Sequence, residues 1–399
     1  GEGGERAFLL LLEAHFAKKK PSASAVQKLL KRQLAKAPST GVHLAAARFA
    51  LAQGEHEDAL KSADVVLQAR PASTAAYLLK SEAEERLGER ATAIATLEVA
   101  RRTTEDGPLV LLALADLVGR GEYPDEALPA ALKLYEQVLA ADPEHHRALY
   151  GKAWVLERQE KYKEAEALYR QVGQLRPVDP SVVESVGFVL FKQGRISDAQ
   201  VQFKKAIDLD PDYASAYANL GATFDAKAEY QKAIDWYEKL LRMKGQEENL
   251  RALVNLAFDH EQLGSFPKAQ KYLEQAHEIQ PEDADILVWL GDNLYFQEKW
   301  KEAARVYVDA IELDDTSFYA WRGLGMTLGR QRKWNDAVDA LEKARKLDDE
   351  DTEVRLALAS MYYSELRDKE KALECFEEYV ALGGADPNVP PLIETLKEE

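Results

Sequence analysis

Small and apolar side chains recur along the chain with a period of 34 residues. Alanine shows this period most clearly, at Ala59 and Ala93, at Ala131, Ala165, Ala199 and Ala233, and at Ala269, Ala303 and Ala337. Prolines punctuate the same pattern at Pro38, Pro71, Pro143, Pro177, Pro211 and Pro281. A fixed period of this length indicates a tandem array in which each repeat packs against its neighbours.

Each period predicts two helices joined by a tight turn, called helix A and helix B below. Small residues on facing positions allow close approach of the two backbones, as at the helix-A glycines Gly221, Gly291 and Gly325. Large residues four positions after the helix-B alanine fill the space between repeats, as at Phe203, Tyr237 and Tyr307. Gly54, Gly194 and Gly264 suit a left-handed turn after helix A. Proline after helix B ends that helix.

The helix-B alanines place eleven repeats on the chain. We expect them to begin near Ala7, Thr40, Thr74, Leu112, His146, Pro180, Ala214, Leu250, Ala284, Phe318 and Thr352. The first repeat is degenerate, with Val26 at the alanine position. Extra residues are expected in loops at 119–124 and 243–248, and one near 365–367. The prediction is a continuous array over residues 1–386, followed by a capping helix over 387–399.

The repeat resembles the tetratricopeptide family. Trp321-x2-Leu324-Gly325 matches the opening of the family pattern, and Tyr217-x2-Leu220-Gly221-x2-Phe224 matches it conservatively. The end of the pattern is matched by Ala199-x3-Phe203, followed by Ala206 and Pro211. The resemblance implies an all-α fold, a right-handed α-solenoid of stacked helix-turn-helix units in which helix A lines the concave side.

Composition agrees with a helical protein that binds neither nucleic acid nor an anionic membrane surface. Of the 399 residues, 46% are hydrophobic and 30% are charged, and the net charge is −17. Residues 1–70 carry 11 basic against 7 acidic side chains, whereas residues 281–399 carry 15 against 28. The acidic C-terminal third favours a basic partner. The alternative is a solvated outer surface that keeps the array soluble.

Cysteine and hydropathy bear on the compartment. Cys375 is the one cysteine, so an intrachain disulfide is impossible. This favours a reducing compartment such as the cytoplasm, with the bacterial periplasm as the alternative. No run approaches the ~18 apolar residues of a membrane span, so we expect no direct membrane insertion. Because residue 1 is Gly, we expect a processed chain or a piece of a longer one.

Motifs for catalysis, cofactors and metals are missing from the sequence. There is no GxxxxGK[ST] loop, HExxH, GxSxG or paired CxxC. The glycines of Gly323-x-Gly325-x3-Gly329 are assigned to helix packing, because they follow no strand. The adjacent pair His145-His146 lacks the spacing of metal ligands, and a role for His260 as a general base is speculative. We therefore predict no enzyme activity, no cofactor and no metal.

A protein or peptide ligand is expected on helix A. The resemblance implies that certain helix-A positions face the concave groove, and these give the candidate partner-binding residues Asn219, Asn255, Phe258, Asp292, Tyr295, Phe296, Tyr319, Arg322 and Arg330. Asn219 and Asn255 share one position, where family members use asparagine to hold peptide backbone. Other repeats have different residues there: Gly151, Ser185, Gly323 and Ala357. The aromatic candidates, with Trp289 beside them, could equally pack between helices.

These observations favour a non-enzymatic scaffold or adaptor. One alternative is an accessory or periplasmic subunit of a bacterial secretion, type IV pilus or exopolysaccharide export machine, where such arrays recur. Another is the regulatory array of a larger enzyme. The family's carboxylate clamp is not reproduced, since Lys227 and Arg251 are not spaced for it. Self-association is possible, because uncapped end repeats expose apolar faces.

Overall fold

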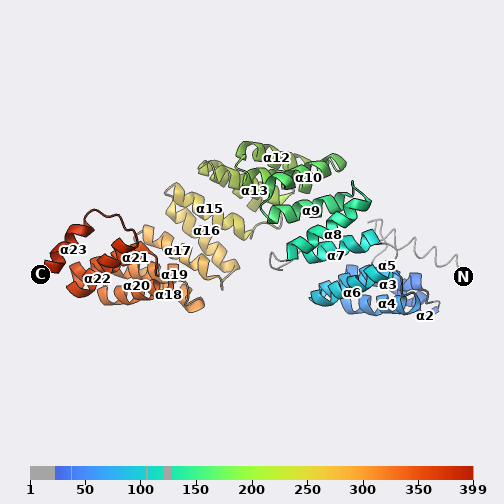
Figure 1. Cartoon of the computed structure of the whole chain (residues 1–399), viewed down its shortest axis with the longest axis horizontal. Coiled ribbons are helices and arrows are strands. Elements are labelled where there is room, and N and C mark those ends of the chain that lie inside the picture. Colours follow the sequence, from blue (N-terminus) through green and yellow to red (C-terminus); the bar gives the residue numbers. More distant parts are fainter. Residues whose placement is uncertain (1–22, 37, 105–106, 120–126, 399) are drawn as a thin grey trace. The chain divides into compact units, whose positions relative to one another are not determined.

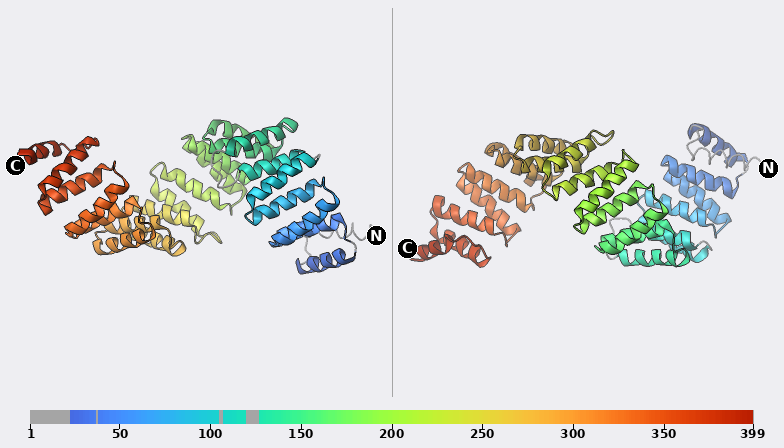
Figure 2. Two further views of the ribbon diagram at one scale, coloured as in Figure 1. Left: turned by 60° about the horizontal axis from the view of Figure 1, so that its bottom comes forward. Right: turned by 90° about the horizontal axis from the view of Figure 1, so that it is seen from above.

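A computed structural model describes residues 23–36, 38–104, 107–119 and 127–398. Within these residues the chain is entirely helical, as predicted, and has no strand. The contacts divide it into two compact units at Arg195 and Ile196, and each unit is described by itself. Consecutive helices within each unit pack side by side (Figures 1 and 2).

Unit 1 ends at Arg195. Its described helices are α2 (Ala23–Lys36), α3 (Thr40–Gln53), α4 (His56–Ala69), α5 (Thr74–Arg86), α6 (Arg90–Thr103), α7 (Gly107–Gly119), α8 (Leu128–Ala141), α9 (His146–Arg158), α10 (Tyr162–Leu175) and α11 (Pro180–Lys192).

Unit 2 begins at Ile196. Its helices are α12 (Ile196–Leu209), α13 (Ala214–Asp225), α14 (Tyr230–Leu241), α15 (Leu250–Gln262), α16 (Phe266–Ile279), α17 (Ala284–Phe296), α18 (Trp300–Leu313), α19 (Phe318–Arg330), α20 (Trp334–Leu347), α21 (Thr352–Met361), the π-helix η2 (Tyr362–Leu366), α22 (Lys369–Ala381) and α23 (Val389–Glu398). Helix A of each repeat in this unit is α13, α15, α17, α19 or α21.

Local signals start and stop the helices where the period places them. Side-chain oxygens accept a hydrogen bond from the first-turn backbone at several helix-A starts, among them Ser39, Ser73, Asp179, Asp283 and Asp351. Helix A starts at the predicted residue in the repeats beginning at Thr40, Thr74, His146, Pro180, Ala214, Leu250, Ala284, Phe318 and Thr352.

One predicted start is wrong, and one lies outside the described residues. Helix A of the fourth repeat begins at Gly107 rather than near Leu112. A start near Leu112 would leave Pro108 before the helix, but Pro108 is the second residue of α7, where proline is tolerated because its missing N–H has no intrahelical partner. The first predicted start, near Ala7, falls among residues that the structure does not describe.

Close packing of small against large residues builds the core of each repeat. The helix-B alanines of the 34-residue period are all fully buried, and so are Phe203 and Tyr237. A Cβ atom on Gly221 would lie 2.6 Å from a ring carbon of Tyr237, so glycine is required where that ring crosses helix A. Burying each large side chain contributes about 1.5–3 kcal/mol, which is why stacking holds the array together.

The extra residue predicted near 365–367 is absorbed as a π-helical turn, η2, directly after α21. Arg367 follows it with φ of 56°, in the left-handed region. Single extra residues within helices commonly take this form. The insertion expected at 119–124 falls mainly on residues outside the described ranges. At the C-terminus, α23 buries Val389, Ile393 and Leu396 in the cluster formed with α21 and α22.

No helix of the described residues is both long and apolar enough to cross a membrane.

Candidate functional site

The predicted partner-binding residues all lie on helix A of successive repeats in unit 2. The side of unit 2 formed by α13, α15, α17, α19 and α21 is called the helix-A surface below. Asn219 lies on α13, Asn255 and Phe258 on α15, Asp292, Tyr295 and Phe296 on α17, and Tyr319, Arg322 and Arg330 on α19.

A pocket of about 200 Å³ opens on the helix-A surface where α17, α19 and α21 meet. Four predicted residues contribute to it, and the sequence analysis did not place the other five in a site. Its lining consists of Asp292, Tyr295, Phe296, Tyr307, Arg322, Gly323, Met326, Glu353 and Val354. We call it the Asp292 pocket.

Asp292 is held by a buried tyrosine. The Tyr307 hydroxyl donates a hydrogen bond of 2.5 Å to Asp292 Oδ1. Desolvation by the surrounding side chains raises the pKa of Asp292, although the bond from Tyr307 and the charge of Arg322 both lower it. Burial, together with the charge of Asp292, raises the pKa of Tyr307. The pair therefore keeps a solvent-accessible carboxylate in one orientation at the pocket.

Arg322 also lines the pocket. Its guanidinium lies over the rings of Phe318 and Tyr319, with centroid distances of 5.5 and 5.4 Å. It pairs with Asp351 at 3.7 Å and with Glu353 at 3.5 Å. These contacts direct the arginine toward the start of α21.

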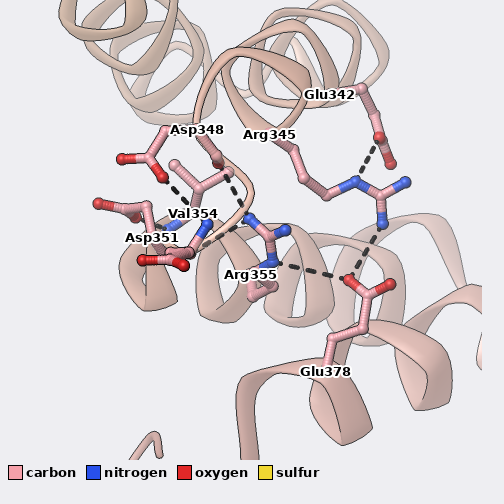
Figure 3. A network of polar contacts seen from close by, with 8 residues as sticks. Glu342, Arg345, Asp348, Asp351, Val354, Arg355 and Glu378 are labelled. Atoms are coloured by element: carbon pink, nitrogen blue, oxygen red, sulfur yellow. Dashed lines mark hydrogen bonds and ion pairs between the residues drawn. The ribbon is translucent and has the colours of Figure 1, made fainter. Parts of the chain in front are cut away.

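A polar network anchors the turn that carries these two acids (Figure 3). Asp351 Oδ1 accepts from the Val354 backbone N–H at 2.7 Å and so caps α21. The buried Arg355 donates to the carbonyl oxygens of Asp348 at 3.3 Å and Asp351 at 3.4 Å. Its guanidinium also pairs with Glu378 at 3.7 Å. The hydrogen bonds of Arg355 and the cap formed by Asp351 therefore hold in place the start of α21, which carries the acids that pair with Arg322.

Arg330 lies one turn beyond the Asp292 pocket along α19. Its Nε donates to the Tyr295 hydroxyl at 3.0 Å, and its guanidinium lies 5.8 Å from the Trp300 ring centroid. Tyr295 packs edge-on against Trp300 at 4.9 Å. Tyr295 and Arg330 therefore bind each other, and both pack against Trp300.

Three of the predicted aromatic residues remain exposed. The exposed fractions are 50% for Phe258, 63% for Phe296 and 60% for Tyr319. Each ring has at least one neighbouring ring, and Phe296 has two: it stacks on Phe266 at 5.9 Å and meets Tyr295 edge-on at 5.8 Å. Exposed aromatic side chains of this size are typical anchors of protein interfaces.

The two asparagines already have partners within the chain. Asn219 is 7% exposed, and its Oδ1 accepts from Arg251 at 3.2 Å. Asn255 Nδ2 donates to the Tyr237 hydroxyl at 3.0 Å. At the same helix-A position of the tenth repeat, a Cβ on Gly323 would lie 2.3 Å from a ring carbon of Tyr307. Asparagine does not fit there for that reason.

A buried carboxyl pair near Asn255 is a further feature that the sequence analysis missed. Tyr237 donates to Asp225 at 2.5 Å, and the carboxyl of Asp225 interacts electrostatically with that of the fully buried Asp259. Burial, followed by the bond to Asp225 and the charge of Asp225, raises the pKa of Asp259 to about 8. The sequence did contain a signal for this pair: Asp259 stands at a helix-A position that the 34-residue period places in the interior between helices.

The other candidate side chains are used structurally. The His145 ring accepts the backbone N–H of Ala148 and so caps α9. Burial lowers the pKa of His260, whose ring stacks on Tyr272 at 5.7 Å. Cys375 is buried. Among the residues the structure covers, no group of three or more His, Cys, Asp or Glu side chains could hold a metal.

Models of known families match most of the chain. A model described as "Tetratricopeptide repeat" matches residues 44–108, 125–180, 254–318 and 322–390, and a second model with this description matches 216–251. A model described as "TPR repeat" matches 187–227.

Curated relatives match over parts of their length. Anaphase-promoting complex subunit cut9 of Schizosaccharomyces pombe is 26% identical over 185 residues, 45% of this chain and 27% of that protein. The TPR repeat-containing protein YpiA of Bacillus subtilis is 22% identical over 263 residues, 64% of this chain and 60% of that protein. Human protein O-mannosyl-transferase TMTC1 is 25% identical over 41% of this chain and 18% of its own length. The chain therefore spans less than two thirds of these relatives.

Solved structures with a related arrangement are also found. Yeast Tom70 has a TM-score of 0.46 and 18% identity, over 100% of this chain and 96% of that chain. The Cut9–Hcn1 complex has a TM-score of 0.46 and 16% identity, over 99% of this chain and 90% of that chain.

Proposed function

The chain belongs to the tetratricopeptide repeat family, and from that premise we propose that it is a non-enzymatic scaffold that binds a segment of a partner protein along the helix-A surface of unit 2. Relatives include a subunit of a multiprotein complex, which supports a role in assembly. The predicted binding residues lie on α13, α15, α17 and α19.

The observation that carries the proposal is the Asp292 pocket with exposed aromatic rings beside it. Phe296 forms part of the pocket wall, and Tyr319 is exposed on the neighbouring α19. Interfaces concentrate their binding energy in a few aromatic and arginine side chains around such pockets. Here Arg322 stands over Tyr319 and lines the same pocket. This combination suits an extended or helical segment with one anchoring side chain.

The acidic C-terminal third supports a partner that is basic overall. Residues 281–399 carry a net charge of −13, and they include α17, α19 and α21. Opposite charge accelerates association and selects among partners more than it adds affinity. The carboxyls with a raised pKa are Asp225, Asp259 and Asp292: Asp225 and Asp292 accept hydrogen bonds from buried tyrosines, and Asp259 is buried beside Asp225. Their roles in packing support binding rather than catalysis.

Selection of random displayed peptides on the full chain tests this function. We expect peptides that bind the full chain and lose at least about tenfold in affinity with the pair Phe296→Ser and Tyr319→Ser, because each removes an exposed aromatic anchor. The matched control is Val201→Ser with Val308→Ser, which removes exposed apolar side chains from the helix-B elements α12 and α18.

The control must leave binding unchanged, and circular dichroism must show that both variants remain folded. Failure to select any peptide, or equal binding to both variants, would contradict a binding role for the helix-A surface.

A further inference from the structure

We propose that the Asp292 pocket receives a lysine or arginine side chain of the bound segment. This rests on the proposed function and adds to it the chemistry of one partner residue. The pocket holds about 200 Å³, below the roughly 300–1,000 Å³ of sites that enclose whole small molecules. Its size therefore suits a single long side chain.

The charges at the pocket favour a cation. Asp292 and Glu353 line it together with one cation, Arg322. Arg322 pairs with Asp351 and Glu353 and lies over two rings, so Asp292 does not have the charge of Arg322 to itself. Three carboxylates thus surround one guanidinium, and the site has room for a second positive charge.

The two neighbouring arginines, Arg330 and Arg355, have partners outside the Asp292 pocket. Arg330 bonds to Tyr295 and lies over Trp300 rather than in the pocket. Arg355 is buried below the α20–α21 turn and pairs with Glu378 (Figure 3). Neither guanidinium is placed to neutralise the pocket carboxylates.

The hydrogen bond from Tyr307 fixes the orientation of the Asp292 carboxylate, which can accept a second hydrogen bond from a charged donor. Among the described residues, Tyr307 is its hydrogen-bond donor, and that bond is made to Oδ1. Oδ2 is therefore left for a ligand. Gly323 maintains this arrangement, because a Cβ there would lie 2.3 Å from the Tyr307 ring and would displace it. Burial raises the pKa of Asp292, and a further cation beside its carboxylate would lower that pKa again.

The walls suit the methylene stem of a basic side chain. Phe296 and Met326 are exposed at the pocket, and Val354 contributes a third apolar surface. Lysine and arginine lay their stems along apolar surface while the charged head reaches a polar partner. The exposed face of Phe296 also offers a cation–π contact. A neutral side chain of similar length would leave the Asp292 charge uncompensated.

Methionine NMR with small amino-acid probes tests the assignment. The chain has three methionines, of which Met326 lines the pocket, while Met243 follows α14 and is the internal reference. N-acetyl-arginine N-methylamide and N-acetyl-lysine N-methylamide are titrated into the full chain labelled with [methyl-13C]methionine. N-acetyl-citrulline N-methylamide is the uncharged control. Met326→Leu assigns the resonance.

We expect both cationic probes to shift the Met326 methyl resonance saturably, with the citrulline probe at least about tenfold weaker, because it lacks the charge-assisted bond. Asp292→Asn keeps an acceptor for Tyr307 but removes the charge, and it should weaken the cationic probes about tenfold. Glu353→Gln, on the exposed rim, should weaken them about threefold.

Equal shifts with the citrulline probe, or full binding by Asp292→Asn, would overturn the assignment. Peptides from the display selection that need Phe296 but tolerate loss of every basic residue would also overturn it, while leaving the scaffold function in place. Cationic probes that bind although no displayed peptide does would support the pocket and contradict the scaffold.

Discussion

We compare two joints of unit 2, where a joint is the place at which helix A and helix B of one repeat meet helix A of the next. Each joint has a hydrogen bond from a helix-B tyrosine to a helix-A aspartate, but one joint is filled and the other contains a pocket. At the joint of α13, α14 and α15, Tyr237 bonds Asp225, and Asn255 of the next helix A donates to the same hydroxyl. At the joint of α17, α18 and α19, Tyr307 bonds Asp292, and the position equivalent to Asn255 is Gly323.

The residue opposite the tyrosine decides whether the joint is filled or open. Asn255 and the buried Asp259 close the first joint with polar groups. Gly323 has no side chain, so the Tyr307 ring lies directly on helix A and a pocket remains beside it. The Asp292 pocket therefore lies at the joint that lacks the side chain which Asn255 supplies at the other joint.

Exchanging these two residues should produce the largest effect. Gly323→Asn forces a side chain into the Tyr307 ring and should destabilise the chain by roughly 3 kcal/mol, as overpacking does. The reverse change, Asn255→Gly, should cost about 2 kcal/mol, from the glycine in a helix and the lost hydrogen bond. Urea unfolding followed by tryptophan fluorescence measures both. Equal stability of Gly323→Asn and the parent chain would contradict the account of the open joint.

The buried carboxyl pair should make the filled joint sensitive to pH. The pKa of Asp259 is raised from 3.8 to about 8, so the folded chain binds more protons than the unfolded chain between those values. Stability should therefore fall as pH rises from about 4 to about 8, and level off above that range. Asp259→Asn removes the titration and should stabilise the chain by on the order of 2 kcal/mol at pH 8.

The advantage of Asp259→Asn should shrink toward pH 4, where Asp259 is protonated in the folded chain. Urea midpoints collected across this pH range give the comparison. Asp292→Asn at the open joint is the matched control and should show a smaller pH dependence, because Asp292 is accessible to solvent. A constant difference between Asp259→Asn and the parent chain would show that the pair does not share a proton.

Removing one hydroxyl should separate the two joints further. Tyr237→Phe leaves Asn255 and Asp225 without their bonds to it and should cost about 1.5 kcal/mol. Tyr307→Phe should cost about 0.5 kcal/mol, because water can replace its bond to the accessible Asp292. Thermal unfolding of the two variants side by side is the measurement. A larger loss for Tyr307→Phe would reverse the order that burial predicts.

The smallest effects concern the turns that follow α13 and α19. Ala228 and Arg332 have φ of 55° and 60° there, in the left-handed region that side chains disfavour. Ala228→Gly and Arg332→Gly should each stabilise the chain by about 0.5 kcal/mol, since the strain removed exceeds the entropy lost. Gly194→Ala, at the matching turn after α11, should destabilise it instead. Differential scanning calorimetry checks the sign of each.

The periodic pattern alone predicted the helix pairs, because each repeat obeys the same local rules. A helix B must have a small residue where it crosses helix A, and the alanines of the 34-residue period meet that need by being fully buried. Caps such as Asp283 and Ser317 mark the helix starts by side-chain bonds to nearby backbone. Among the described repeats, one start was misplaced, at α7. Proline can stand either after the end of a helix or in its first turn, and Pro108 stands in the first turn.

For the helix-A surface, the sequence predicts which residues lie on helix A but not which contacts they make. The 34-residue spacing alone places Asn255, Asp292 and Arg322 on helix A, because this spacing is a local property of the chain. The hydrogen bond from Asn255 to Tyr237 and the ion pair of Arg322 with Asp351 become visible only in the folded chain. The Asp292 pocket likewise becomes visible only there. These outcomes depend on which side chains three neighbouring helices bring together, and no periodic pattern along one chain contains that information.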